Sequence, residues 1–132
     1  MPAFTTPRTW TDGELIEAAT IMNVHVRDNL AALKIATLAK SSNYPIVAAD
    51  GLHVEILVDT TSGTVTITLP AAASSAGVVV TCKKKVAANT MTIDGNGAET
   101  IDGAASISTT AIYSSRTVIC DGTTWWIIGS YA

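Results

Sequence analysis

The chain has 132 residues, of which 48% are apolar and only 14% carry a charge. A charged share well below the usual ~25% argues against intrinsic disorder, which combines high charge with low hydrophobicity. The net charge of −3 gives no support to nucleic acid as a partner. No secretory signal is visible, and no segment reaches the ~18 consecutive apolar residues of a membrane span. We therefore expect a soluble protein that is made in a cytoplasm.

Residues 1–12 are rich in Thr and Pro, and we expect them to be extended. Pro2 and Pro7 disfavour a helix in this segment. Trp10 stands alone among polar residues. An isolated apolar side chain on such an arm docks either on another protein or on the helix of its own chain, and the sequence leaves both possibilities open.

Residues 14–38 carry the only helical pattern of the chain. Met22, Val26 and Leu30 recur at every fourth position and form one apolar stripe. The pattern lasts barely two heptads, and a helix of this length is marginal in water on its own. It therefore needs the rest of the chain or partner helices to pack against. We expect residues 39–50 to be a linker.

From Ile46 onward the apolar period changes to two, which indicates strands. Dipeptides such as Asp-Gly and Ser-Gly separate the alternating runs at intervals of about ten residues. This pattern is typical of an all-β sandwich or barrel. We expect a mainly β protein with a compact antiparallel β-sandwich or barrel-like domain over residues 51–132. The expected strands lie at 52–59, 64–70, 77–86, 90–95, 99–103, 105–115, 116–122 and 124–131.

Alternation within these strands predicts which side chains face the core. Val65, Ile67 and Leu69 share one face of their strand, and threonines occupy the other face. By the same pattern, Trp126 and Ile128 are expected to share an apolar face. Thr-rich faces with few charges are surfaces that neighbouring subunits can cover.

The two cysteines, Cys82 and Cys120, both lie in alternating apolar runs. Two cysteines do not make a disulfide framework, and a buried free cysteine is ordinary. We expect free thiols, with a bridge between the two residues as the alternative.

The residue types that carry catalysis are scattered along the chain. Neither His25 nor His53 has a partner at the spacing of a nucleophile or a metal ligand. Residues 94–99 have the oxygens that begin a calcium loop, but they lack its twelve-residue frame and terminal bidentate Glu. A turn is the better interpretation of that segment, because Asp and Asn hydrogen-bond to their own backbone in turns. We expect no enzymatic activity, no metal and no cofactor.

Two surface clusters have a structural and a functional interpretation. Lys83, Lys84 and Lys85 lie on one strand, with the middle lysine facing away from the other two. We expect a solvated edge that guards against stray strand pairing, and contact with an acidic surface is the alternative. Trp125 and Trp126 form either a platform for sugars or the more common pair of one core and one interface Trp.

Two long segments of the chain match patterns of a known class. Residues 6–34, TPRTWTDGELIEAATIMNVHVRDNLAALK, combine a Thr-Pro-x-Thr-Trp arm, a Gly-Glu pair and an Asn-x-His-x-Arg-Asp-Asn-Leu helix. This segment resembles the N-terminal module of small structural proteins of tailed bacteriophages. Residues 64–129 contain TITLP, a G-x-x-V-x-x-K-K strand, a TIDG pair and a final DG-x-x-W. They are similar to a β-domain of phage tail fibres and other virion appendages.

The resemblance implies a non-enzymatic virion component, commonly a homotrimer, whose N-terminal module attaches to the particle while the β-domain projects. The short linker favours a capsid-decorating or head-fibre protein over a long tail fibre. The implied partner is the major capsid protein or another virion protein, and the implied location is the virion surface after assembly in the host cytoplasm. The residues expected to anchor the chain to the particle are Trp10, Met22, Val26, Arg27, Asp28 and Leu30.

A second hypothesis is a tail-fibre or tail-tip protein that binds glycans on the host surface. Its contacts, or those of a subunit interface, would come from Trp125, Trp126 and Tyr131.

Overall fold

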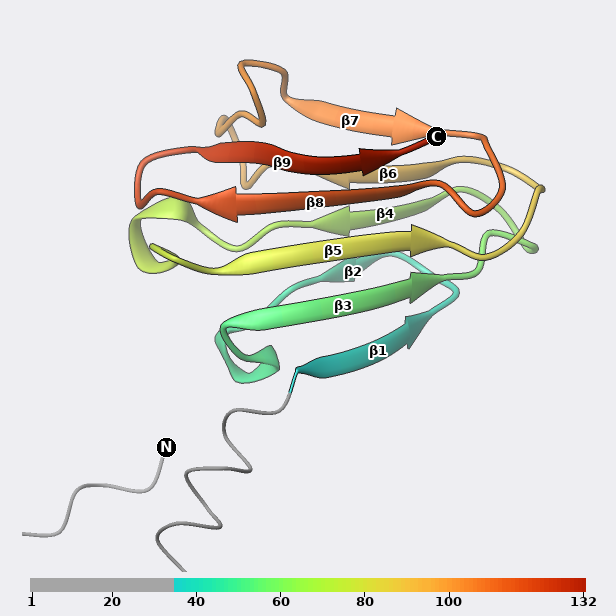
Figure 1. The fold of residues 1–132 in the computed structure, drawn as a ribbon, viewed down its shortest axis with the longest axis horizontal. Helices are drawn as coiled ribbons and strands as arrows, with labels where there is room; N and C mark the ends of the chain where they lie inside the picture. Colours follow the sequence, from blue (N-terminus) through green and yellow to red (C-terminus); the bar gives the residue numbers. More distant parts are fainter. Residues whose placement is uncertain (1–34) are drawn as a thin grey trace, which may run out of the picture. The chain divides into compact units, whose positions relative to one another are not determined.

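The computed structural model describes residues 35–132, which form nine strands and two short 3-10 helices (Figure 1). In this part of the chain no helix is long and apolar enough to cross a membrane. The elements in chain order are β1 (Ala36–Lys40), β2 (Tyr44–Pro45), η1 (Ala48–Asp50), β3 (His53–Val58), β4 (Val65–Thr68), η2 (Ala72–Ser74), β5 (Val79–Lys84), β6 (Met91–Asp94), β7 (Ser106–Thr109), β8 (Ser115–Cys120) and β9 (Trp125–Tyr131).

The expected N-terminal arm lies outside the described residues, and so does the expected helix up to residue 34. The same holds for the six expected anchoring residues Trp10, Met22, Val26, Arg27, Asp28 and Leu30.

The expected linker over residues 39–50 is wrong, as is the helical end at 36–38. This stretch holds β1, β2 and η1, and Ile35–Ala132 form one compact unit. Residues 36–40 pair with β3 along their whole length. The backbone hydrogen bonds of this pairing outweigh the helix propensity of Ala and Leu, which is a weak preference that tertiary contacts override.

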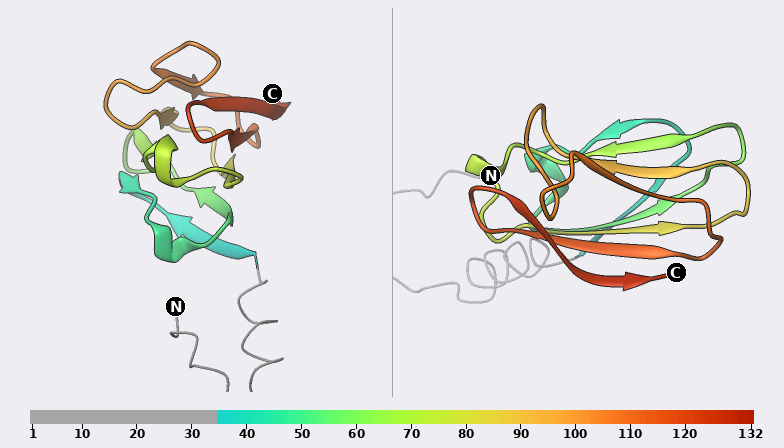
Figure 2. Two further views of the ribbon diagram at one scale, coloured as in Figure 1. Left: turned by 90° about the vertical axis from the view of Figure 1, so that its left-hand side faces the viewer. Right: turned by 90° about the horizontal axis from the view of Figure 1, so that it is seen from above.

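The strands form two mixed sheets, which face each other as two layers (Figure 2). Sheet A has the order β1-β3-β5-β8-β9, and sheet B has the order β2-β4-β6-β7. β1, β3 and β5 run parallel to one another, and so do β2, β4 and β6. Only β7, β8 and β9 add antiparallel pairs. The mainly β class is therefore confirmed, whereas the expectation of an antiparallel domain is wrong for the first six strands.

Successive strands alternate between the two sheets, so the chain winds through three coils: β1–β2, β3–β4 and β5–β6. Because the next strand of the chain lies in the other sheet, each strand pairs with the corresponding strand of the neighbouring coil. These pairs run parallel. The third coil repeats the second residue by residue, since Val54 pairs with Val80 and Ile67 with Ile93. The last three strands then complete both sheets through antiparallel pairs.

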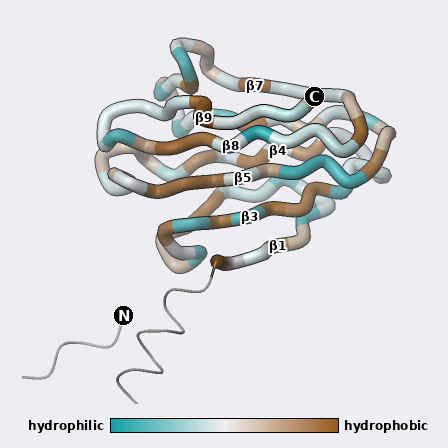
Figure 3. Tube along the Cα trace, viewed as in Figure 1, coloured by the Kyte–Doolittle hydropathy of each residue, from teal (hydrophilic) through white to brown (hydrophobic). Residues whose placement is uncertain are grey.

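The core lies between the sheets and is filled by the inward side chains of both. Figure 3 shows the alternation of hydrophobic and hydrophilic residues along the strands that produces it. Val65, Ile67 and Leu69 are at most 1% exposed, which confirms the face predicted for them.

Trp126 and Ile128 lie on one face of β9, as expected, but this face is open to solvent. Trp125 is fully buried and Ile127 packs partly buried against the core, whereas Trp126 and Ile128 are exposed. The segment from residue 125 to residue 128 consists of four apolar residues in a row. Such a run contains no alternation from which to read the inward face.

Both cysteines are buried and free, as expected. Cys82 pairs with Arg116, which lies four residues from Cys120 on the same strand. At about 3.4 Å per residue the backbones of the two cysteines are roughly 14 Å apart along the strand, beyond the reach of a disulfide. Burial raises the pKa of the Cys82 thiol to about 12.

Lys84 is fully buried, so the expectation of a solvated lysine edge is wrong for this residue. Its strand, β5, lies in the interior of sheet A between β3 and β8. The Lys84 ammonium group donates to the carbonyl oxygens of Ala88, at 3.0 Å, and of Val86. The Thr60 hydroxyl also donates to the Ala88 oxygen. These bonds fix the connection between β5 and β6 to the preceding coil.

Replacing Lys84 with Ala is expected to lower the free energy of unfolding by about 3 kcal/mol, because it leaves two carbonyl oxygens without their charged donor and opens a cavity. Urea unfolding of the full chain measures the change. Lys85→Ala is the matched control, since Lys85 is exposed, and its effect should stay within about 0.5 kcal/mol. Equal losses in the two variants would contradict this role for Lys84.

Candidate functional site

The outward side chains of sheet A form three rows across the strands, which together we name the outer face of sheet A. The cross-strand pairs fix the rows of this face. The first row is His53, Val79, Ile119 and Trp126, the second is Glu55, Thr81, Thr117 and Gly129, and the third is Leu57, Lys83, Ser115 and Tyr131.

Large apolar side chains of this face are open to solvent. Leu57 is 37% exposed, Trp126 47% and Tyr131 61%. Ile128 is 59% exposed and lies at a β-bulge, because Val118 pairs with Ile127 whereas the preceding residue of β8 pairs with Gly129. The extra residue of a bulge has no partner and changes the direction of its side chain.

Small side chains separate these apolar groups in the middle of the face. The hydroxyl oxygens of Thr81 and Thr117 lie 3.1 Å apart and share a hydrogen bond. Gly129 lies beside Thr117, and a Cβ at this glycine would lie 3.5 Å from the Thr117 Cβ. The middle row of the face is therefore recessed relative to the larger side chains at the two ends of β9.

Trp126 is held by the turn that precedes its strand. Its indole N–H donates to Asp121 Oδ2 at 2.7 Å. The other carboxylate oxygen accepts from the backbone N–H groups of Thr123 and Thr124 at 2.8 and 2.9 Å. The bond from Trp126 is the largest of the causes that hold the pKa of Asp121 well below its usual range. The exposed indole is therefore fixed in one orientation.

Lys83 brings a positive charge to the other end of β9. Its ammonium nitrogen lies 5.2 Å from the centroid of the Tyr131 ring, and it donates to the carbonyl oxygen of Tyr113. The charge thus lies beside Tyr131, although the backbone of Lys83 belongs to β5. Arg116 also contributes here, by donating to the Tyr131 carbonyl oxygen at 3.0 Å.

The outward face of sheet B has a different chemistry. One of its rows joins Thr66, Thr92 and Ser108, with the last two hydroxyls 2.9 Å apart. The next row joins Thr68, Asp94 and Ser106. Apart from Pro45, which pairs with Thr68, this face consists of hydroxyl groups and one carboxylate, and it lacks the large apolar side chains of the outer face of sheet A.

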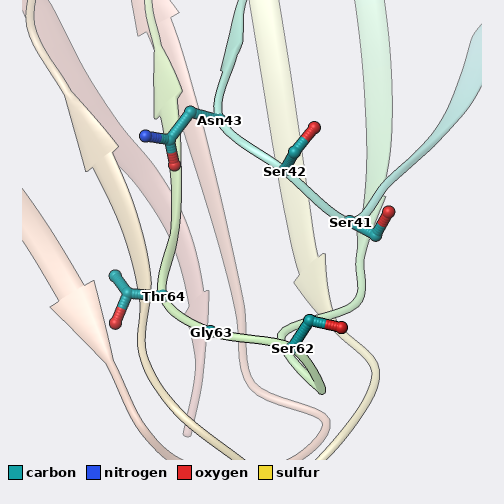
Figure 4. A pocket seen from close by; sticks show the side chains of 6 residues that line it. All are labelled: Ser41, Ser42, Asn43, Ser62, Gly63 and Thr64. Carbon is teal, nitrogen blue, oxygen red and sulfur yellow. The ribbon is translucent and has the colours of Figure 1, made fainter.

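An open hollow of about 420 Å³ lies between the β1–β2 turn and the β3–β4 turn (Figure 4). Asn43 lines it, and its side-chain oxygen accepts from the backbone N–H of Thr66 at 2.8 Å. Its lining has no ionisable side chain. The lining therefore contains no general acid or base, and no base that could activate one of its hydroxyl groups as a nucleophile. The full lining is Ser41, Ser42, Asn43, Ser62, Gly63 and Thr64.

The segment compared with a calcium loop is a turn whose polar side chains hold the backbone. Both oxygens of the Glu99 carboxylate accept from the backbone N–H of Ala72, at 3.0 Å. Asn96 donates to the Leu69 carbonyl oxygen at 3.4 Å. Among residues 35–132 no three His, Cys, Asp or Glu side chains gather in a way that could hold a metal ion. His53 is exposed on β3.

The three residues expected at a glycan site or an interface divide into two groups. Trp125 is buried and takes no part in a surface contact. Trp126 and Tyr131 lie on the same face, but their partners on β8 are four residues apart, or roughly 13 Å. Leu57 and Ile128 were missed. The alternation of the β3 segment places Leu57 on the outward face, whereas nothing in the sequence marks the bulge at Ile128.

No protein-family model matches this chain, and no curated protein is significantly similar to it. The resemblance of residues 6–34 and 64–129 to phage structural proteins stays a prediction from their motifs.

Trp126→Phe is expected to raise the pKa of Asp121 toward its ordinary value of 3.8, because the variant removes the strongest hydrogen bond to the carboxylate. In the wild type the stabilisation from this carboxylate is present above pH 3.8 and is lost as the pH falls through the lower pKa of the folded state. In the variant this stabilisation is smaller, and its loss is complete at a higher pH. A carboxyl NMR titration of the full chain measures the pKa.

Asp59 is an internal control in the same spectra. Its pKa is also lowered, through hydrogen bonds from Thr61, and the substitution at Trp126 leaves those bonds intact. An unchanged pKa of Asp121 in the variant, or an equal rise in both aspartates, would contradict the assigned cause.

Proposed function

We propose that this chain is a non-enzymatic structural protein of a tailed bacteriophage, which forms a homotrimer and serves as a capsid-decoration or head-fibre protein. The observation that carries the proposal is the outer face of sheet A, where Leu57, Trp126, Ile128 and Tyr131 are between 37% and 61% exposed. Apolar side chains gathered on one face mark interaction sites. Trp and Tyr are also the residues most enriched at protein interfaces.

The composition supports assembly from copies of the same chain. Only 14% of the residues are charged and the net charge is −3, so repulsion between copies is small. The outward faces of the described strands carry mainly hydroxyl groups and apolar side chains, with the charged side chains Glu55, Lys83 and Asp94 among them. Few charges therefore have to be desolvated when such a face is covered.

The attachment to the particle is assigned to residues 6–34, because of their resemblance to the N-terminal module of phage structural proteins. In this proposal the major capsid protein or another virion protein is the partner, and the β-domain projects from the virion surface. The anchoring contacts come from Trp10, Met22, Val26, Arg27, Asp28 and Leu30.

The second candidate is a tail-fibre or tail-tip protein that binds host glycans. It is favoured by the fixed, 47% exposed indole of Trp126, because an aromatic ring with an open face packs against the apolar side of a sugar. A glycan array with the full chain separates the candidates. Binding that Trp126→Ala abolishes while the oligomeric state is unchanged would favour glycan recognition, and the absence of binding leaves decoration as the proposal.

The purified full chain is expected to have three times the mass of the 13.7 kDa chain in light scattering at micromolar concentration. A monomer under these conditions would contradict the proposed assembly. In purified virions, quantitative mass spectrometry measures the copy number. Hundreds of copies per particle are expected for capsid decoration, and only a few copies would place the protein in the tail.

A further inference from the structure

We propose that the trimer is held by contact between two different ends of the outer face of sheet A, so that the β9 end of one copy packs on the β3 end of the next. This inference rests on the proposed homotrimer and adds the surface that forms it. We define the β9 patch as Trp126, Ile128 and Tyr131. The β3 patch consists of Glu55 and Leu57 of β3 together with Ala39 of β1, which is exposed and pairs with Leu57.

Symmetry requires two patches of this kind. A contact of one patch with itself closes a dimer, whereas a ring of three needs each copy to offer two complementary surfaces. The two patches lie on opposite sides of β5 and β8 in sheet A. The hydroxyl pair Thr81–Thr117 lies between them. One face therefore carries two patches at its opposite ends, with hydroxyl groups between them in the middle row and Val79 and Ile119 between them in the first row.

The charges of the two patches are complementary. The backbone of Lys83 pairs with Leu57, but its ammonium group lies 5.2 Å from the ring centroid of Tyr131 and so brings its charge to the β9 patch. The β3 patch carries the half-buried Glu55 carboxylate. Contact between unlike patches brings these opposite charges together, whereas contact between two β9 patches brings two ammonium groups together. Like charges disfavour an interface, and opposite charges set its orientation. The charges therefore favour contact of the β9 patch with the β3 patch of the next copy over contact between two β9 patches.

The exposed area of the β9 patch suits an interface of ordinary size. Trp126 and Tyr131 are 47% and 61% exposed, and aromatic side chains bury 150–250 Å² each, so the two rings together still expose on the order of 200 Å². That is about a quarter of the ~800 Å² that each partner contributes to a standard interface. Two rings at the centre of an interface are the usual composition of a hot spot.

A pair of introduced cysteines tests the contact. The full chain with Leu57→Cys and Tyr131→Cys carries one thiol in each patch. These positions are three strand spacings apart within one copy, or about 14 Å. A thiol cross-linker shorter than this separation therefore joins only different copies. The native Cys82 and Cys120 are 0% and 2% exposed and do not compete in the folded protein.

We expect covalent dimers and trimers from the double variant on a denaturing gel, and only monomers from either single variant. The matched control is Pro45→Cys with Ser106→Cys, which spans three strand spacings on the outward face of sheet B. This control is expected to stay monomeric on the gel. Covalent dimers from a single variant would indicate a self-complementary contact and overturn the inference.

These experiments distinguish a failure of the proposed homotrimer from a failure of the proposed contact surface. A wild-type monomer in light scattering overturns the proposed homotrimer, and the inference falls with it. A wild-type trimer that cross-links in the sheet B control but not through the two patches overturns the surface alone. As a second readout, Trp126→Ala is expected to raise the concentration of half-dissociation about tenfold or more, with an unchanged circular dichroism spectrum. An unchanged concentration would also overturn the inference.

Discussion

After each of its first five strands the chain crosses from one sheet to the other, and this crossing decides how the strands pair. The backbone groups of a coil can then reach partners only in the neighbouring coil, which makes β1, β3 and β5 parallel in sheet A and β2, β4 and β6 parallel in sheet B. The inward side chains of successive coils consequently stack in columns, as Val54 on Val80 and Ile67 on Ile93 do. Hydrogen bonding and core packing thus depend on the same geometry.

In the third coil the column of inward apolar side chains stops at a lysine, the last residue of β5. Val58 pairs with Lys84, and the buried ammonium group donates to carbonyl oxygens of the turn that leads into β6. A charge can be buried here because the carbonyl oxygens of the turn replace the water that it loses. Beyond β6 the chain reverses, and β7, β8 and β9 add the antiparallel pairs that complete both sheets.

Period-two alternation is a local signal, so it predicted most of the later strands and the buried face of Val65, Ile67 and Leu69. Pairing direction is not local, because parallel and antiparallel strands alternate in the same way and a Gly-containing turn serves either a hairpin or a crossing between sheets. The informative signal was the similarity of TVTI (64–67) to TMTI (90–93), which occupy equivalent positions in two coils. β1 was missed because ATLAK has no alternation and follows a helical pattern.

The exposed face is a consequence of closing the core. Once Trp125 fills the space between the sheets, the alternation of β9 forces the next residue outward, and the indole of Trp126 reaches solvent. The same alternation turns Ile128 outward, and the bulge leaves this residue without a partner on β8. The sequence identified the Trp pair but could not show which of the two is buried, because either of two adjacent aromatic residues can face the core. The division is set by pairing, since Trp125 lies opposite the buried Cys120 and Trp126 opposite Ile119. The hairpin that completes the fold therefore also creates the surface available for assembly.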